Sequence, residues 1–217
     1  DQNGIKTFYA YRGMKPLPRN DVKLTQDILA LNYRDVAKKP ITGNFTDCRQ
    51  EALEVFKRFS LNSENSWASS AAFESTALVV DPANGSLSGI AADVFRHAGC
   101  GEVIEVNNLG DVNLDSGVGD LEGHKIITSS MINKKSGAFR KHKAVLKMFE
   151  LGRKRKQKIL AGKSRISGAV FDADGDRFYR LDYHPRRDAL LVLSGDETAF
   201  MQAQYLMARN PDRYQGA

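Results

Sequence analysis

The sequence has few of the residues that would tie it to a disulfide scaffold or a membrane. It has two cysteines, Cys48 and Cys100, in 217 residues, which is too few for a disulfide framework or a thiolate metal site. We therefore expect a reducing, cytoplasmic compartment. No run of about 18 apolar residues occurs, so no membrane span is predicted, and the first residues lack the apolar centre of a secretory signal. Because the chain does not begin with methionine, we interpret it as a processed or excised piece of a longer protein.

Charge is present in an ordinary amount but is unevenly distributed. Segment 134–165 holds thirteen Lys and Arg against one acid, Glu150, so its net charge is +12, and the rest of the chain is −6. Such a block indicates either an anionic partner such as nucleic acid or an exposed helix with one apolar side. Few aromatic side chains interleave with the charges. We favour the helix because apolar residues recur at helical spacing, namely Val145, Met148, Phe149 and Leu151.

The order of apolar segments predicts a helical N-terminal part followed by an α/β part. An edge strand over 5–11 and two helices, over 22–38 and about 46–61, are expected first. The second helix is expected to bury Ala52, Leu53, Val55, Phe56 and Phe59. Strands are then predicted at 76–80, 102–106, 168–172, 177–183 and 190–193, with helices from Ser86 or Ser88 to His97, over the basic segment, and over 195–208. We predict an α/β three-layer sandwich, with a mixed, mostly parallel sheet flanked by helices.

Three aspartates, Asp172, Asp174 and Asp176, follow a buried strand within the segment SGAVFDADGDRFYRL. Alternate residues of a tight loop at a strand end can point to one centre, and three carboxylates suit a hard cation such as Mg²⁺. Arg177 is next to them and can balance the carboxylates or bind a phosphate. None of the four histidines stands at metal-ligand spacing to another histidine or a cysteine, and we assign them no role.

Two other interpretations of this loop compete with the magnesium site. An EF-hand loop needs glycine at its sixth position and glutamate at its twelfth, where this chain has Arg177 and Tyr183. A haloacid-dehalogenase-type phosphatase would use Asp172 as nucleophile and Asp174 as acid and base. That motif normally opens its fold, whereas here only 41 residues follow Asp176. The phosphatase nevertheless stays open as an alternative.

The aspartate loop resembles the metal-binding loop of the α-D-phosphohexomutases, the phosphoglucomutase/phosphomannomutase family, with Ala173 in place of the commoner glycine. ALVVDPANG (77–85) and GIAADVFRHAGCGEVIEVNN (89–108) are similar to the opening of that family's second domain. LLVLSGDETAFMQAQYL (190–206) is similar to the entry to its third. The resemblance implies that Asp172, Asp174 and Asp176 ligate Mg²⁺. It also implies that Arg177 contacts the phosphate or the phosphoserine.

The resemblance further implies that the chain is only part of a mutase. Residues 1–185 would correspond to the second domain, with a basic helical insertion at about 125–165, and residues 186–217 to the start of the third. The family's phosphoserine motif and its sugar-recognition loop have no counterpart here. We therefore expect a cytoplasmic isomerase fragment that is inactive alone. In the parent, the partners would be a hexose phosphate and the remaining mutase domains, with neither membrane nor nucleic acid. The alternative from another class is a non-catalytic module that binds through the basic segment.

Overall fold

The computed structural model describes residues 8–9, 13–38, 40, 43–62, 70–133 and 135–213, which fall into two units, Asp1–Cys48 and Arg49–Ala217. The first unit contains α1 (Pro18–Leu29) and α2 (Tyr33–Ala37), and no residue of α1 is buried. Helix α1 begins at Pro18 because proline has no N–H to leave unpaired in a first turn. Because α1 ends at Leu29 and α2 begins at Tyr33, the single helix predicted over 22–38 is wrong. The strand predicted over 5–11 lies mostly outside the described residues.

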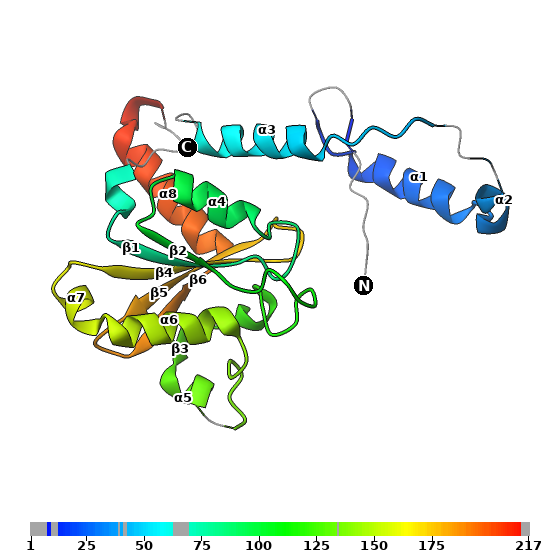
Figure 1. Cartoon of the computed structure of the whole chain (residues 1–217). Helices are drawn as coiled ribbons and strands as arrows, with labels where there is room; N and C mark the ends of the chain where they lie inside the picture. The colour runs from blue at the N-terminus through cyan, green and yellow to red at the C-terminus, as the bar shows by residue number, and fades with distance from the viewer. Residues whose placement is uncertain are drawn as a thin grey trace. The chain divides into compact units, whose positions relative to one another are not determined.

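The second unit is built on one six-stranded sheet of order β2-β1-β4-β5-β6-β3 (Figure 1). Strand β1 pairs in parallel with β2 and β4, whereas the pairs β4–β5, β5–β6 and β6–β3 are antiparallel. The strands are β1 (Thr76–Asp81), β2 (Glu102–Glu105), β3 (Ile126–Thr128), β4 (Arg165–Phe171), β5 (Phe178–His184) and β6 (Ala189–Leu193). The expected α/β sandwich with a mixed sheet is confirmed. Strand β3 was not predicted.

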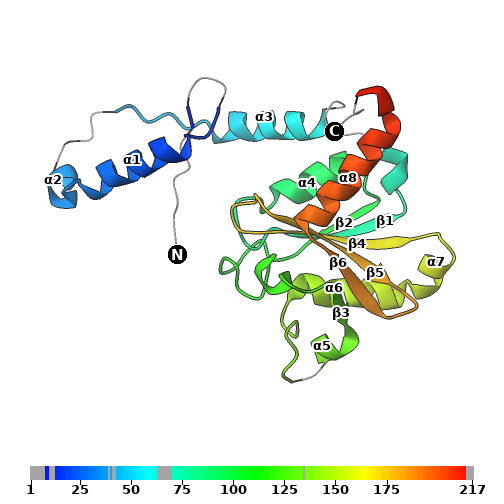
Figure 2. The same ribbon diagram turned by 180° about the vertical axis from the view of Figure 1, so that it is seen from behind.

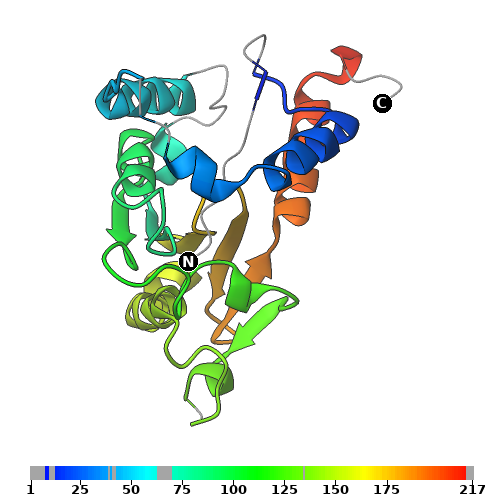
Figure 3. The ribbon, with the colours of Figure 1, turned by 90° about the vertical axis from the view of Figure 1, so that its right-hand side faces the viewer.

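Helices cover both faces of this sheet and give the fold its three layers (Figures 1 and 3). Helix α6 (Lys143–Lys154) packs on one face, while α4 (Ile90–His97) and α8 (Gly195–Arg209) lie over the other. The view from behind shows the same arrangement (Figure 2). The remaining helical elements of this unit are α3 (Arg49–Leu61), η1 (Ser70–Phe73), η2 (Gly119–Leu121), α5 (Ser129–Asn133), α7 (Lys156–Leu160) and η3 (Pro211–Arg213).

The basic segment forms one layer of the sandwich. The apolar stripe of α6 predicted from its spacing is buried, so an exposed basic helix with one apolar side is confirmed. Helix α6 joins the larger core cluster with β1, β4, β5 and β6. Strand β3, also within the predicted insertion, extends the sheet beside β6. The description of 125–165 as an insertion into a mutase domain stays a prediction, while the structure shows that this segment supplies one layer of the sandwich.

Helix termini and buried faces differ from the sequence expectations in two places. Helix α4 begins after Gly89, whose φ of 76° is in the left-handed region, and no serine side chain caps it. The residues expected to face inward on α3 are not buried, because α3 packs only on the edge of the unit, beside α4. By contrast, α8 begins with a capping box in which Ser194 and Glu197 exchange hydrogen bonds.

The proposed equivalence of residues 186–217 to a third domain stays a prediction. Strands β5 and β6, on either side of that boundary, pair from Arg180↔Leu193 to His184↔Ala189. Residues 49–217 form a single unit. Among the described residues, no helix is both long and apolar enough to cross a membrane.

Candidate metal centre

Three loops meet at one edge of the sheet. Because β1, β2 and β4 are parallel neighbours, their carboxyl ends lie at the same edge. The loops that leave these ends are 82–89, 106–118 and 172–177. In open α/β sheets this edge is where ligand sites are found. The aspartate loop therefore lies where the fold places its sites.

The structure brings the three predicted carboxylates together. One ligand oxygen from each of Asp172, Asp174 and Asp176 lies within 4.8 Å of the other two. Asp172 is buried and the other two are exposed. A tight turn makes this possible: the backbone N–H of Gly175 donates to the carbonyl of Asp172 at 3.1 Å, and Gly175 has a φ of 77°. The alternate spacing predicted from the sequence is thus realised in the loop.

Arg177 is the immediate counter-charge of this cluster. Its backbone N–H donates to Asp172 Oδ1 at 3.0 Å and its Nε donates to Asp172 Oδ2 at 2.8 Å. Burial raises the pKa of Asp172, but hydrogen bonds from Arg177 and an interaction with Asp174 outweigh it and lower that pKa to about 2. The hydrogen bond to Asp172 in turn raises the pKa of Arg177. Asp172 is therefore ionised at neutral pH.

The loop after β1 supports the aspartate loop from one side. The backbone N–H of Ser86 donates to the carbonyl of Ala173 at 2.8 Å. A Cβ placed on Gly85 would lie 2.1 Å from that same carbonyl oxygen, which is far inside contact distance. Only glycine therefore permits this close approach of the two backbones. The position of Ala173, between two of the aspartates, depends on it.

A buried carboxylate that sequence reasoning missed ties these loops together. Asp81 is fully buried and accepts hydrogen bonds from the backbone N–H groups of Ala83 and Gly117 and from Asn107 Nδ2, at 2.9, 3.1 and 2.9 Å. Burial raises its pKa, while the nearby His142 and these donors oppose the rise. One carboxylate thus fixes both the loop after β1 and the loop after β2. Its place at the carboxyl end of a buried parallel strand was the available signal.

His142 extends this network to helix α6. Its side chain is buried, its Nε2 lies 3.1 Å from the Gly117 carbonyl oxygen, and its Nδ1 lies 3.9 Å from Asp81 Oδ2. The sequence assigned no role to this histidine. The structure makes it the link between the α6 layer and the loops at the site. His124 packs edge-on against Phe139, whose ring also lies beside that of His142.

The cluster fits a hard divalent cation but does not select one. Carboxylate oxygens are the ligands that Mg²⁺, Ca²⁺ and Mn²⁺ prefer, and two exposed carboxylates leave room for water or a phosphoryl oxygen. Like charges this close are costly without a cation, and Arg177 supplies one positive charge for three negative ones. A divalent ion bound by these oxygens would neutralise more of the negative charge. The residues that would hold it are Asp172, Asp174 and Asp176.

Comparison of the chain with protein-family models, with curated proteins and with solved structures gives no match. The interpretation of the site therefore depends on its geometry and on the resemblance of its loop.

Proposed function

We propose that this chain is the metal-loop part of a phosphohexomutase, an enzyme that moves a phosphoryl group between positions of a hexose phosphate such as glucose 1-phosphate. The observation that carries the proposal is the cluster of Asp172, Asp174 and Asp176 at the carboxyl end of β4, with Arg177 against it. Phosphoryl transfer depends mainly on positioning and on neutralisation of charge. A carboxylate-bound divalent ion supplies that neutralisation when it is bound.

The residues of the chain have separate parts in this proposal. The three carboxylates hold Mg²⁺. Arg177 holds Asp172 ionised, and its side chain is 60% exposed, so it can also face a phosphate or phosphoserine outside the loop. The chain has the metal site without the serine nucleophile, which would come from another mutase domain. We therefore expect no turnover from the chain alone.

The geometry favours a ligand role for Asp172 over the nucleophilic role that a phosphatase would require. Both of its carboxylate oxygens accept hydrogen bonds from Arg177. A nucleophilic oxygen must be free to approach phosphorus in line, and these bonds oppose that approach. A carboxylate fixed in this way can still share an oxygen with a cation.

Metal binding is the first test. Mn²⁺ affinity is measured by water-proton relaxation, with Mg²⁺ as competitor, in the wild-type chain and in the Asp174→Asn and Asp176→Asn variants. Each variant loses one charged ligand, so we expect at least about tenfold weaker binding. Asp27→Asn, in α1, is the matched control and should bind Mn²⁺ like the wild type. Equal Mn²⁺ affinity in all four proteins would contradict the proposed metal site.

The phosphoryl role is tested by phosphorus NMR. With Mn²⁺ bound, the line of a phosphoserine peptide should broaden in the presence of the wild-type chain more than with free Mn²⁺ or Asp174→Asn. No such difference would contradict the mutase proposal. In parallel, glucose 1-phosphate with Mg²⁺ should stay unchanged over hours. Release of inorganic phosphate that Asp172→Asn abolishes would instead establish the phosphatase. Formation of glucose 6-phosphate would show that the nucleophile is present after all.

A further inference from the structure

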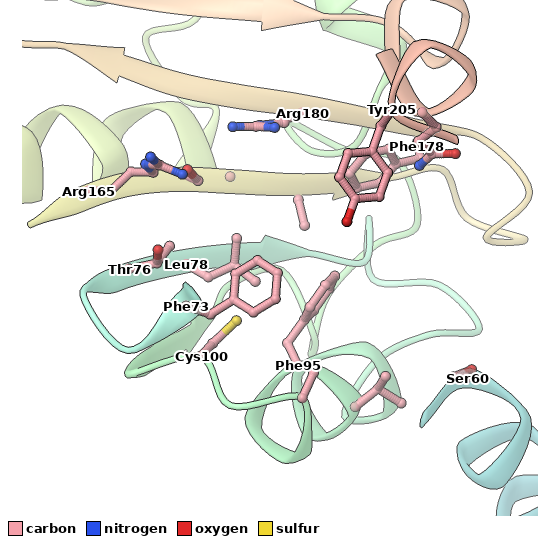
Figure 4. A pocket seen from close by; sticks show the side chains of 16 residues that line it. Ser60, Phe73, Thr76, Leu78, Phe95, Cys100, Arg165, Phe178, Arg180 and Tyr205 are labelled. Atoms are coloured by element: carbon pink, nitrogen blue, oxygen red, sulfur yellow. The ribbon is translucent and has the colours of Figure 1, made fainter. Parts of the chain in front are cut away.

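A cavity lies on the opposite side of the sheet from α6, and neither the metal centre nor the proposed mutase chemistry uses it. Its volume is about 620 Å³, within the range of about 300–1,000 Å³ typical of small-molecule sites. Helix α4 forms one wall with Val94 and Phe95, and helix α8 forms the other with Gln202 and Tyr205 (Figure 4). Strands β1, β4 and β5 form the floor. We call this cavity the groove.

The groove exists because a small side chain stands in the middle of its floor. Ala169 of β4 is paired with Val80 of β1 and with Arg180 of β5. Its small side chain lines the groove together with the larger Leu78 and Phe178, each two residues along from those partners. An alanine among larger side chains leaves space that the two helices do not fill. Phe73 and Cys100 close the side next to α4. The body of a ligand would therefore meet mainly apolar and aromatic groups.

Positive charge is concentrated at one end of the groove. Arg165 and Arg180 line that end, and both also line a neighbouring cavity of about 420 Å³ (Figure 4). Arg180 pairs with Asp182 at 2.9 Å, and Asp182 also accepts a 2.6 Å hydrogen bond from Ser167. Within the described part of the chain, the guanidinium of Arg165 has no such carboxylate. The three charges therefore leave a net +1 at Arg165.

We propose that the groove is a binding site for a small amphipathic carboxylate, with an aromatic or aliphatic body on the sheet and its carboxylate on Arg165. Guanidinium binds carboxylate through two parallel hydrogen bonds, which gives both affinity and orientation. The volume disfavours a partner helix: one helical turn about 10 Å across fills about 420 Å³, so the groove holds barely one and a half turns. A ligand with two fused rings or a short alkyl chain fits better.

The charged end of the groove lies far from the metal centre. Arg165 begins β4 and Asp172 follows its last residue, so about 20 Å of strand separates them. Binding in the groove should therefore be unchanged in Asp174→Asn. Failure of either proposal leaves the other standing.

The test uses the two cysteines as internal reporters. Cys100 lines the groove and burial raises its thiol pKa, whereas Cys48 is exposed outside it. Alkylation of both thiols by iodoacetamide is followed by mass spectrometry with increasing 2-naphthoate. We expect saturable slowing of Cys100 by at least tenfold and no change at Cys48. Absence of protection at millimolar 2-naphthoate would overturn the site. Protection that instead grows with protein concentration would assign the groove to a second copy of the chain.

Charge selectivity is tested with the neutral amide of the same ring system and with Arg165→Gln. Each change removes one charge-assisted pair. The amide should therefore bind the wild-type chain about tenfold more weakly than 2-naphthoate does, and 2-naphthoate should bind Arg165→Gln about tenfold more weakly than it binds the wild type. Arg186→Gln, an exposed arginine outside the groove, is the matched control and should change nothing. Equal affinity for acid and amide, or no effect of Arg165→Gln, would overturn the carboxylate assignment. Ala169→Leu should abolish binding of either compound, and retained binding would place the ligand elsewhere.

Discussion

Replacing Arg177 with glutamine should weaken the fold through the ionisation of Asp172. Burial of this carboxyl group raises its pKa, yet the two hydrogen bonds from Arg177 help to lower the pKa from 3.8 to about 2. A fall of this size contributes about 2 kcal/mol to the free energy of unfolding at neutral pH. The backbone N–H of residue 177 remains in the variant, so we expect Arg177→Gln to lose about 1–2 kcal/mol. Asp174 and Asp176 lose the same counter-charge, which acts in the same direction.

This loss should depend on pH with a definite sign. The pKa of Asp172 in the folded chain is below its ordinary value of 3.8, so its ionised form stabilises the fold above about pH 4. That contribution disappears as the pH falls to about 2. In Arg177→Gln the pKa of Asp172 rises again, because the side-chain hydrogen bond that most strongly opposes the effect of burial is lost. The difference in free energy of unfolding between the wild type and Arg177→Gln should therefore have its full value at pH 7 and disappear near pH 2.

The assay is urea unfolding from pH 7 to pH 2 in the presence of a chelator, combined with a carbon NMR titration of the aspartate carboxyl groups. Arg186→Gln is the matched control and should follow the wild type at every pH, since this arginine is exposed away from the aspartate loop. A stability difference that stays constant across the whole pH range would refute the reasoning. An unchanged pKa of Asp172 in Arg177→Gln would do so as well.

Two further predictions concern the α6 layer and the support of the aspartate loop. Met148→Ala should cost about 2–5 kcal/mol in urea unfolding, because Met148 is fully buried, whereas Met201→Ala on the exposed side of α8 should stay within about 0.5 kcal/mol. Similar losses of stability in Met148→Ala and Met201→Ala would show that the packing of α6 on the sheet contributes little to the core. Gly85→Ala should weaken Mn²⁺ binding at least about tenfold, because its Cβ would displace the carbonyl of Ala173, while Gly119→Ala, with open space around it, should not. Unchanged Mn²⁺ affinity in Gly85→Ala would show that metal binding does not depend on the contact between Gly85 and Ala173.

The parts of the fold that were predictable are those with a local signal. Short apolar runs mark most of β1 (77–80) and the second half of β4 (168–171), and the stripe of α6 follows helical spacing, so each is visible in the sequence. The first three residues of β4, which include Arg165 and Ser167, carry no such signal and were not predicted. Strand β3 has three residues of which only Ile127 is buried, and so short a strand forms only because β6 is there to pair with it. Its pairing partner lies more than sixty residues away along the chain. No local pattern carries that information.

The candidate site divides in the same way. Asp172, Asp174 and Asp176 were predictable because their spacing and their place after a strand are local features. The roles of Asp81 and His142 were not, because each depends on contacts between segments far apart in the sequence. A buried aspartate looks like any turn aspartate until the loops around it are placed. Sequence reasoning therefore found the residues that would meet a ligand and missed those that hold them.

The two faces of the sheet differ in how tightly they pack, and this difference separates the two proposed sites. On the α6 face, a Cβ on Gly168 would lie 2.6 Å from the sulfur of Met148, and one on Gly152 would lie 2.5 Å from the ring of Tyr183. Helix and sheet therefore approach as closely as glycine allows, and His142 transmits this packing to the loops at the metal centre. The opposite face leaves a cavity above Ala169. Substitutions in the groove should consequently alter ligand binding with little cost to the fold, whereas substitutions under α6 should disturb both the core and the metal centre.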